Sequence, residues 1–313
     1  MICCEISGGL GNQFFRYAFA RALQESRKTN GQNDVLYINY GAIDHHGFLG
    51  DLSDFALTEH KDFFCRRLLL KKGTLWQIIL YFFITKICRF LSSEQVYKVL
   101  GKNGIVISQN PDCETLFLPS TNHRKVFTIG SFENEKYISS IKELLFREFV
   151  PKHDVLSRNK DLYETILSTN SICLAIRRGD FMEDEYKKTF YVCDLSYYKN
   201  AIKIIRERVE HPVFVVFSND IKWVKENLEI EGDVLWEFED NPVWETFRLM
   251  YSCKHFIISN STLHWWAQYK GEYSDKIVIS PDRWYNAPGW ENHLLLDYFI
   301  KIPTGVENPY KKK

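Results

Sequence analysis

The side chains best suited to chemistry are Arg177, Arg178 and Asp180, which follow the apolar run 172–174 with Gly179 between them. That run has the composition of a buried strand, and α/β proteins bind ligands at the ends of such strands. A guanidinium carries a fixed fork of donors that matches two phosphate oxygens at once. Ordinary ion pairs at a strand end would explain two arginines alone. Their combination with Gly-Asp and with similar segments elsewhere predicts a phosphate-binding strand end.

Three other segments are also polar or rich in glycine and lie between an expected strand and an expected helix. They are residues 8–13 (GGLGNQ), 218–220 (SND) and 259–262 (SNST). Glycines allow a ligand to approach the backbone, and a helix N-terminus favours negative charge. The residues predicted to contact a bound nucleotide are Gly9, Gly11, Asn12, Asp220, Ser259, Asn260, Ser261 and Thr262. Helix capping needs only one Ser, Thr or Asn, so the run of four at 259–262 favours a ligand role over capping alone.

Several familiar sites are missing from the sequence. Gly9 and Gly11 match part of a dinucleotide fingerprint, but the third glycine position holds Phe14, which disfavours a nicotinamide cofactor. The sequence has no G-x-x-x-x-G-K-[ST] phosphate loop, no Asp-x-Asp and no H-E-x-x-H motif. We therefore expect no metal and no cofactor, and a bound diphosphate would be neutralised by arginine and backbone amides.

The composition is that of a globular protein of 313 residues with 45% hydrophobic residues. Forty basic residues balance forty acidic ones, which disfavours a nucleic-acid partner. Aromatic residues make up 15%, which suits either a packed core or a sugar-binding surface. Eight scattered cysteines without a C-x-x-C pair, and a first segment without signal-peptide character, lead us to expect a cytoplasmic protein.

Residues 66–91 are rich in basic, aliphatic and aromatic side chains, but Gln77, Lys86 and Arg89 interrupt the apolar run. This interruption disfavours a transmembrane helix. Two interpretations remain open. The segment is either a helix packed inside the domain or a helix in peripheral contact with the inner face of the membrane.

The pattern of elements predicts two α/β domains, 1–150 and 151–313, with the boundary at Pro151. After residue 170 strands and helices alternate five times, which is typical of a Rossmann-like sheet. The expected strands there are 171–177, 213–217, 234–236, 255–258 and 276–279. The first domain is less regular, with a loop at 7–13, a helix from residue 14 to about 25, a mostly helical stretch at 50–110 and a helix at 134–149.

Five motifs in order resemble those of glycosyltransferase family 11, the α-1,2-fucosyltransferases. They are residues 8–18 (GGLGNQFFRYA), 176–181 (IRRGDF), 217–223, 253–267 and 279–285. The resemblance implies a GT-B-like α/β fold with two Rossmann-like domains facing a cleft. It also implies inverting, metal-independent transfer of fucose from GDP-fucose to the 2-hydroxyl of a galactose-containing acceptor. The setting expected is the synthesis of a bacterial surface glycan.

The same resemblance assigns roles to the domains and to the arginines. Residues 1–150 would form the acceptor side and 151–313 would bind the nucleotide sugar. Arg177 would hold the β-phosphate of the donor, and Arg178 would support it. Positive charge there would stabilise GDP as it leaves.

Three positions depart from the family pattern. Ala175 stands where the family often has histidine, Asn219 replaces the first acid of an acid pair, and Leu263-His264 replaces an aromatic-serine pair. The identity of the catalytic base stays open between Asp180 and the acids at 183–185. A loose transition state assisted by the departing phosphate or by Asn12 is a further alternative.

Two other functions remain under consideration. One is a transferase of the same architecture that uses another GDP-sugar or forms another linkage. The other is a carbohydrate-binding module without catalysis, which the aromatic content would suit. A neutral sugar would not require the arginines at 177–178, and this favours the transferase.

Overall fold

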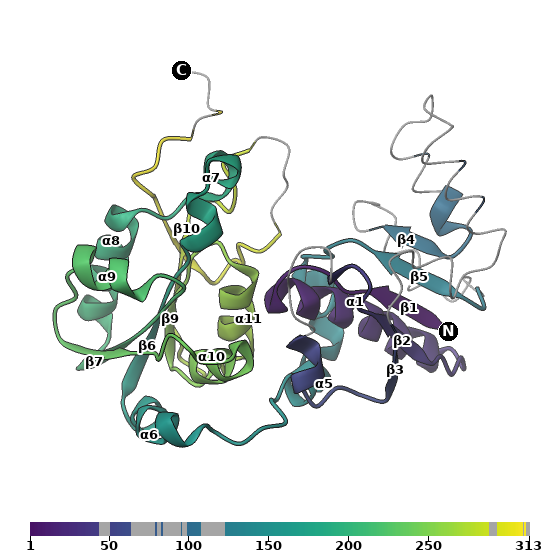
Figure 1. The fold of residues 1–313 in the computed structure, drawn as a ribbon, viewed down its shortest axis with the longest axis horizontal. Helices are drawn as coiled ribbons and strands as arrows, with labels where there is room; N and C mark the ends of the chain where they lie inside the picture. Colours follow the sequence, from purple (N-terminus) through teal and green to yellow (C-terminus); the bar gives the residue numbers. More distant parts are fainter. Residues whose placement is uncertain are drawn as a thin grey trace. The chain divides into compact units, whose positions relative to one another are not determined.

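The computed structural model describes residues 1–43, 51–63, 79, 83, 95, 99–107, 123–287, 293–308 and 310. The chain divides into two compact units, Met1–Val150 and Pro151–Lys313. The division falls at the position where the sequence pattern changes. Each unit contains one parallel sheet with helices packed on it (Figure 1).

Unit 1 is built on a five-stranded sheet in the order β3-β2-β1-β5-β4. Its strands are β1 (Ile2–Glu5), β2 (Leu36–Asn39), β3 (His60–Phe63), β4 (Ile105–Ile107) and β5 (Val126–Ile129), and all neighbours are parallel. The central strand β1 is almost wholly buried because its ICCE sequence has apolar or thiol side chains at three consecutive positions. The expectation of a mostly helical stretch at 50–110 is wrong for β3 and β4, which gain strand structure by pairing with β2 and β5 despite weak local propensity.

Helix α1 (Leu10–Thr29) covers the sheet of unit 1 with a face that includes the fully buried Phe14, Phe15 and Phe19. The helix starts four residues earlier than the sequence predicts, so the expectation of a loop through residue 13 is wrong. Gly11 is tolerated there because the first-turn amides have no intrahelical partners, and the entropic cost of glycine is smallest at a helix end.

The segment before residue 150 is less regular than the predicted helix 134–149. It consists of two 3₁₀ turns, Glu135–Tyr137 and Ser139–Ile141, followed by α5 (Lys142–Glu148). After α5, Phe149 stacks on Phe14 of α1 with ring centroids 4.0 Å apart. A further 3₁₀ turn, Asp51–Asp54, packs near the start of α1. These contacts close the core of unit 1.

Unit 2 is built on a six-stranded parallel sheet in the order β11-β10-β9-β6-β7-β8. The strands are β6 (Asn170–Ile176), β7 (Pro212–Ser218), β8 (Asp233–Trp236), β9 (His255–Ile257), β10 (Val278–Pro281) and β11 (Ile300–Ile302). Five of them match the expected strands, and β11 was not expected. The long apolar runs of β6 and β7 are buried on both faces, as central parallel strands are.

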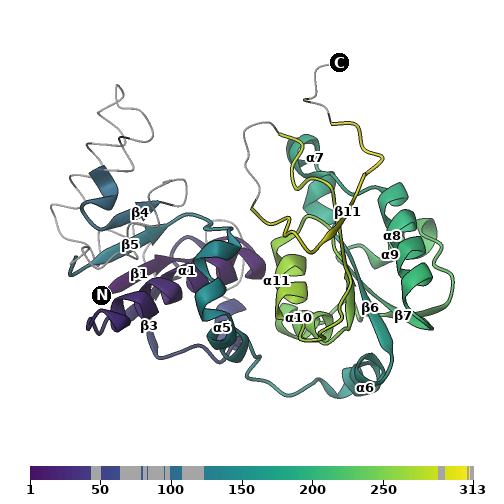
Figure 2. The same ribbon diagram turned by 180° about the vertical axis from the view of Figure 1, so that it is seen from behind.

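The helices of unit 2 lie on both sides of this sheet, with α8 and α9 on one side and α10 and α11 on the other (Figures 1 and 2). Their bounds are α6 (Lys160–Ser168), α7 (Asp184–Phe190), α8 (Leu195–Arg208), α9 (Ile221–Asn227), α10 (Val243–Tyr251) and α11 (Thr262–Lys270). Two 3₁₀ turns, Ser157–Asn159 and Gly179–Met182, complete the unit. The expected fold class, α/β with two Rossmann-like units, is confirmed.

Each sheet has one point where the order of strands reverses. In unit 2 the chain proceeds from β6 outward to β7 and β8, then returns to place β9 on the other side of β6. In unit 1 the corresponding point lies between β1 and β5. Ligands of open α/β sheets bind outside the carboxyl ends of the strands at such reversals. The fold therefore predicts that a ligand contacts the residues that follow β6 and β9 in unit 2, or those that follow β1 in unit 1.

No helix in the described ranges has both the length and the apolar character needed to cross a bilayer. The segment 66–91, for which membrane contact was one open interpretation, lies outside the described residues apart from Ile79 and Phe83.

Candidate functional site

Arg177 is the first residue after the central strand β6 and keeps about a third of its side chain exposed. Its Nη2 donates to Asp180 Oδ1 at 2.7 Å, and its guanidinium lies 5.6 Å from the centre of the Phe181 ring. Both partners come from the 3₁₀ turn that follows β6, so the turn orients the guanidinium without enclosing it. A partly exposed cation fixed at the strand-order reversal is suited to bind an anionic group.

Arg178 is more deeply buried than Arg177, with 13% of its side chain exposed. Its Nε donates to Asp220 Oδ2 at 3.2 Å, and its guanidinium lies only 3.3 Å from the centre of the Trp223 ring. Its backbone N–H donates to Asn219 Oδ1 at 2.9 Å. These contacts join the end of β6 to the turn after β7. Arg178 is thus placed to support Arg177, as the family resemblance implies.

Gly179 is required by a close approach. Its φ of +36° lies in the left-handed region, and a Cβ added there would overlap the side-chain amide of Asn219. The same Asn219 accepts the hydrogen bond from Arg178. A side chain at position 179 would therefore displace the link between the two strand ends.

Asp220 has two protein partners. Its carboxylate caps α9 by accepting from the Trp223 backbone N–H at 3.2 Å, and it also accepts from Arg178. Its own N–H donates to Ser218 Oγ at 3.0 Å. The structure thus gives this predicted nucleotide-binding residue a part in building the strand ends.

The turn after β9 contains two buried polar residues. Asn260 is 4% exposed, and its amide nitrogen donates to the carbonyls of Phe190 and Trp284 at 2.9 and 2.8 Å. Ser259 is fully buried, with its hydroxyl 2.9 Å from His264 Nδ1. Ser261 and Thr262, at the N-terminus of α11, remain partly exposed. Of the four predicted residues here, the last two keep surface that a ligand can reach.

His264 lies in the first turn of α11 and is 5% exposed. Burial, and after it the nearby charge of Arg177, lowers the pKa of the imidazole from 6.5 to about 3. The side chain is therefore uncharged at neutral pH, and the guanidinium of Arg177 has no second cation from this residue beside it.

We expect His264 to make the protein sensitive to acid. Below pH 6.5 the unfolded chain gains a proton at His264 that the folded chain does not bind until about pH 3. The free energy of unfolding should therefore decrease as pH falls through this window, by on the order of 1 kcal/mol per pH unit from this group. Urea unfolding of His264→Asn between pH 4 and 7 should show a shallower acid slope than the unsubstituted protein.

The control for this prediction is His211→Asn, because His211 is exposed and its φ of +46° suits asparagine. This variant should keep the original slope. An unchanged slope in His264→Asn would contradict the assignment of a buried neutral imidazole.

The glycine segment of unit 1 lies at the carboxyl end of β1. Gly8 has a φ of +78°, and a Cβ there would come within 2.7 Å of Asn12 Nδ2. Gly9 is the N-cap of α1 and has no atom within 4 Å of an added Cβ, so its surface is open. Gly11 is buried in the first turn, and Asn12 is half-buried beside Gly8. Of these residues Gly9 offers the backbone a ligand could approach.

Gln13 holds this segment in place, a role the sequence did not reveal. Its amide is fully buried and donates to the Gly8 carbonyl at 2.9 Å and to Asp51 at 3.4 Å. Burial, together with repulsion from Asp54, raises the pKa of Asp51 to about 6. The only feature of the sequence that pointed to this role is the position of Gln13 within the motif at residues 8–18.

The structure of unit 2 brings together Arg177, Arg178, Asp180 and Asp220 at the ends of β6 and β7, with the turn 259–262 at the end of β9. Within the described ranges, no group of three or more His, Cys, Asp or Glu side chains is arranged to hold a metal ion. The donors that this edge offers to a diphosphate are a guanidinium and the first amides of α11. They can balance negative charge by hydrogen bonds that are already oriented.

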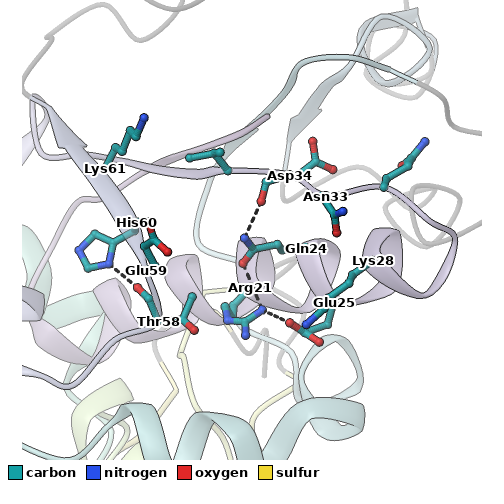
Figure 3. A pocket seen from close by; sticks show the side chains of 12 residues that line it. Arg21, Gln24, Glu25, Lys28, Asn33, Asp34, Thr58, Glu59, His60 and Lys61 are labelled. Atoms are coloured by element: carbon teal, nitrogen blue, oxygen red, sulfur yellow. Dashed lines mark hydrogen bonds and ion pairs between the residues drawn. The ribbon is translucent and has the colours of Figure 1, made fainter.

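A pocket of about 390 Å³ in unit 1 lies elsewhere (Figure 3). It is lined by side chains of α1, of the segments before β2 and β3, and of the start of β3, including Arg21, Glu25 and His60, several of which pair with one another. Because it lies where β3 begins, it is at the opposite edge of the parallel sheet from the glycine segment. It is therefore separate from the predicted site of unit 1.

Two parallel α/β sheets, with an arginine at the strand-order reversal of the second, fit the architecture of a GT-B-type glycosyltransferase. A family model described as Glycosyl transferase family 11 matches residues 1–293. The chain belongs to this family, and the resemblance drawn from the five sequence motifs is confirmed.

Two relatives of known name align with most of the chain, and a third aligns with part of it. An α-1,2-colitosyltransferase of Escherichia coli is 29% identical over 91% of this chain and 92% of its own length. The O-antigen biosynthesis glycosyltransferase WbnK of Escherichia coli is 28% identical over 95% of this chain and 99% of its own. The human galactoside α-(1,2)-fucosyltransferase 1 is 36% identical, over 30% of this chain and 27% of its own length.

Among solved structures, the α-1,6-fucosyltransferase NodZ, co-crystallised with GDP, has a similar fold. The TM-score is 0.52 at 14% sequence identity, and the match covers 85% of this chain and 91% of that one. The likeness supports the fold class inferred from the strand order.

Proposed function

We propose that this glycosyltransferase transfers fucose from GDP-fucose to the 2-hydroxyl of a galactose residue in a bacterial surface glycan, with inversion and without a metal. The α-1,2 linkage and the bacterial glycan are supported by the names of the relatives that span the chain. Fucose and galactose are supported by the relative that matches a third of it.

The observation that carries the proposal is the placement of Arg177. Its side chain keeps about a third of its surface exposed at the strand-order reversal of unit 2 and is oriented by Asp180, while the Arg178 side chain is held by Asp220 and Trp223. A GDP leaving group gains negative charge on its β-phosphate as the glycosidic bond breaks. A preoriented guanidinium stabilises that charge more in the transition state than in the bound donor, which accelerates transfer.

In this proposal unit 2 binds the nucleotide sugar and unit 1 contacts the acceptor. Ser261, Thr262 and the first amides of α11 would complete the phosphate contacts. Gly9 and Asn12 lie in unit 1, so this proposal assigns them to the acceptor side instead of to the nucleotide contacts predicted from the sequence. Asp180 is half-exposed beside Arg177 and would accept the acceptor proton, while its ion pair holds the arginine in place.

A second donor has support of its own, since a relative that spans 91% of the chain is a colitosyltransferase. Colitose differs from fucose by the absence of the 3-hydroxyl. A site that hydrogen-bonds this hydroxyl strongly disfavours the sugar that lacks it, whereas a site that leaves it uncontacted accepts both. The two donors are therefore separable by kinetics.

The test is a matrix of donors and acceptors. GDP-fucose, GDP-colitose and GDP-mannose are each combined with lactose, N-acetyllactosamine and galactosyl-N-acetylhexosamine, with and without EDTA. We expect the largest kcat/KM for GDP-fucose, an α-1,2 product by NMR, and no loss of rate with EDTA. A larger kcat/KM for GDP-colitose would identify GDP-colitose, and not GDP-fucose, as the donor. Loss of activity in EDTA would contradict charge stabilisation by Arg177 and the amides.

A further inference from the structure

A row of aromatic rings begins beside Arg177 and leads away from it. The Phe181 ring, against the Arg177 guanidinium, stacks on Phe190 with centroids 5.4 Å apart. Phe190 in turn meets the edge of Tyr285 at 5.6 Å, and Tyr186 lies 6.1 Å from Phe190. These rings come from α7, its flanking turn and the loop after β10. We call this group the aromatic row.

The aromatic row is held rigidly by two buried amides. Asn260 donates to the carbonyl of Phe190, and Asn286, which is 3% exposed, donates to the carbonyl of Tyr191 at 2.9 Å. The Asn286 backbone N–H donates to the Thr189 carbonyl at 2.9 Å. The end of α7 is therefore fixed to the loops that follow β9 and β10. Such support is what a binding surface needs to hold its geometry before a ligand arrives.

The far end of the aromatic row opens into a pocket of about 390 Å³. Tyr285 belongs to both, and Asp282, Asn308 and Tyr310 also line the pocket. The volume lies within the range of roughly 300–1,000 Å³ typical of small-molecule sites. The Arg283 guanidinium at its wall donates to Asn286 Oδ1 and to the Val306 carbonyl, at 2.8 and 2.6 Å.

The chemistry of this surface suits a neutral polyol better than an anion. The pocket presents the half-exposed carboxylate of Asp282 and the amide of Asn308, and the cation beside them is engaged by protein acceptors. Aromatic faces pack against the C–H faces of pyranose rings, while carboxylates and amides bind hydroxyls. A glycan also fits the position. The reacting hydroxyl must come within about 3.5 Å of the sugar carbon attached to the phosphate at Arg177, so the rest of the acceptor lies nearby.

We propose that the aromatic row and the pocket at its end form an acceptor-glycan subsite on unit 2, which binds the sugars next to the one that is modified. This inference rests on the proposed function and adds to the acceptor side assigned to unit 1. In this arrangement Tyr186 contacts the glycan beside Phe190, and Tyr310 contacts it in the pocket.

The experiment compares three exposed tyrosines of unit 2. Tyr186→Ala and Tyr310→Ala remove rings that are 40% and 44% exposed, the first beside Phe190 of the aromatic row and the second in the pocket. Tyr273→Ala removes a ring of matched exposure, 39%, that packs on His255 at the amino end of β9, the opposite edge of the sheet. Binding of N-acetyllactosamine, lactose and galactosyl-N-acetylhexosamine to the GDP-saturated protein is measured by NMR titration, and GDP binding is measured by calorimetry.

We expect the first two variants to weaken oligosaccharide binding by about threefold to tenfold each, with GDP affinity unchanged. The Tyr273→Ala variant should match the unsubstituted protein in both measurements. Equal oligosaccharide binding in all three variants would overturn the inference, as would failure of the unsubstituted protein to bind any of the three. A parallel loss of GDP affinity would assign the pocket to the donor. A protein that binds glycan through these tyrosines but transfers no fucose would contradict the proposed function only.

Discussion

Replacing Arg177 with alanine should lower kcat by about a thousandfold or more while the protein stays folded. The guanidinium is a third exposed and its ion pair with Asp180 is half-exposed, so its loss should cost less than about 1 kcal/mol of stability. The effect on the rate is much larger, because the positive charge acts on a leaving group whose charge grows only in the transition state. Rates of transfer from GDP-fucose and thermal unfolding measured together test this expectation.

Two variants sharpen the interpretation of that result. Arg177→Lys keeps the charge but loses the bidentate fork, and should recover only part of the rate. Arg206→Ala removes another exposed arginine of unit 2, paired with Glu231, and should change neither rate nor stability. Near-normal turnover in Arg177→Ala would refute the assigned role.

Replacing Arg178 with alanine should reduce folding stability more than the rate of transfer, in contrast to Arg177→Ala. The side chain is 13% exposed, and its removal breaks the ion pair to Asp220 and the stack on Trp223. We expect a loss of about 2 kcal/mol in the free energy of unfolding. We also expect a rise of about tenfold in the KM for the donor, because the ends of β6 and β7 lose their link and Arg177 is less well positioned.

The control for Arg178 is Lys225→Ala. Lys225 also lies over an indole, with its Nζ 5.0 Å from the centre of the Trp236 ring, but that ring belongs to β8 and not to the end of β6 or β7. Its removal should change stability by less than about 1 kcal/mol. If Arg178→Ala lowered kcat as much as Arg177→Ala without loss of stability, the division of roles between the two arginines would be wrong.

The strands of unit 2 were predictable because their sequences carry the signal locally. The runs at 172–176 and 213–217 are long, apolar and followed by polar turns, so burial on both faces follows from composition. The sequence HKDF of β3 has no such signal, and it is a strand because β2 offers it an open edge. Helix α7 was missed because its sequence, DEYKKTF, has no buried face. Its end is fixed instead by Asn260 and Asn286, which come from distant parts of the chain.

The candidate site was foreseen in part for a similar reason. The positions of Arg177 and Asp180 follow from the end of a strong strand, and their ion pair needs only a three-residue spacing. The partners of Asp220 and Asn260 could not be predicted, because their contacts join segments 24 to 70 residues apart. A polar residue in a motif can contact a ligand or hold the backbone that does, and the motif alone does not distinguish them.

The two hydrogen bonds of Asn260 bear on how relatives of this enzyme can diverge. The Asn260 carboxamide donates to the carbonyls of both Phe190, the last residue of α7, and Trp284. A shift of either backbone segment would therefore break one of these two hydrogen bonds. Residues 183–188 between Met182 and Thr189 are all exposed and carry none of these anchors. Insertions, deletions and changes of charge there should therefore cost little folding stability. Evolution of new acceptor preferences should therefore be found as length variation within this stretch, between two ends that do not change.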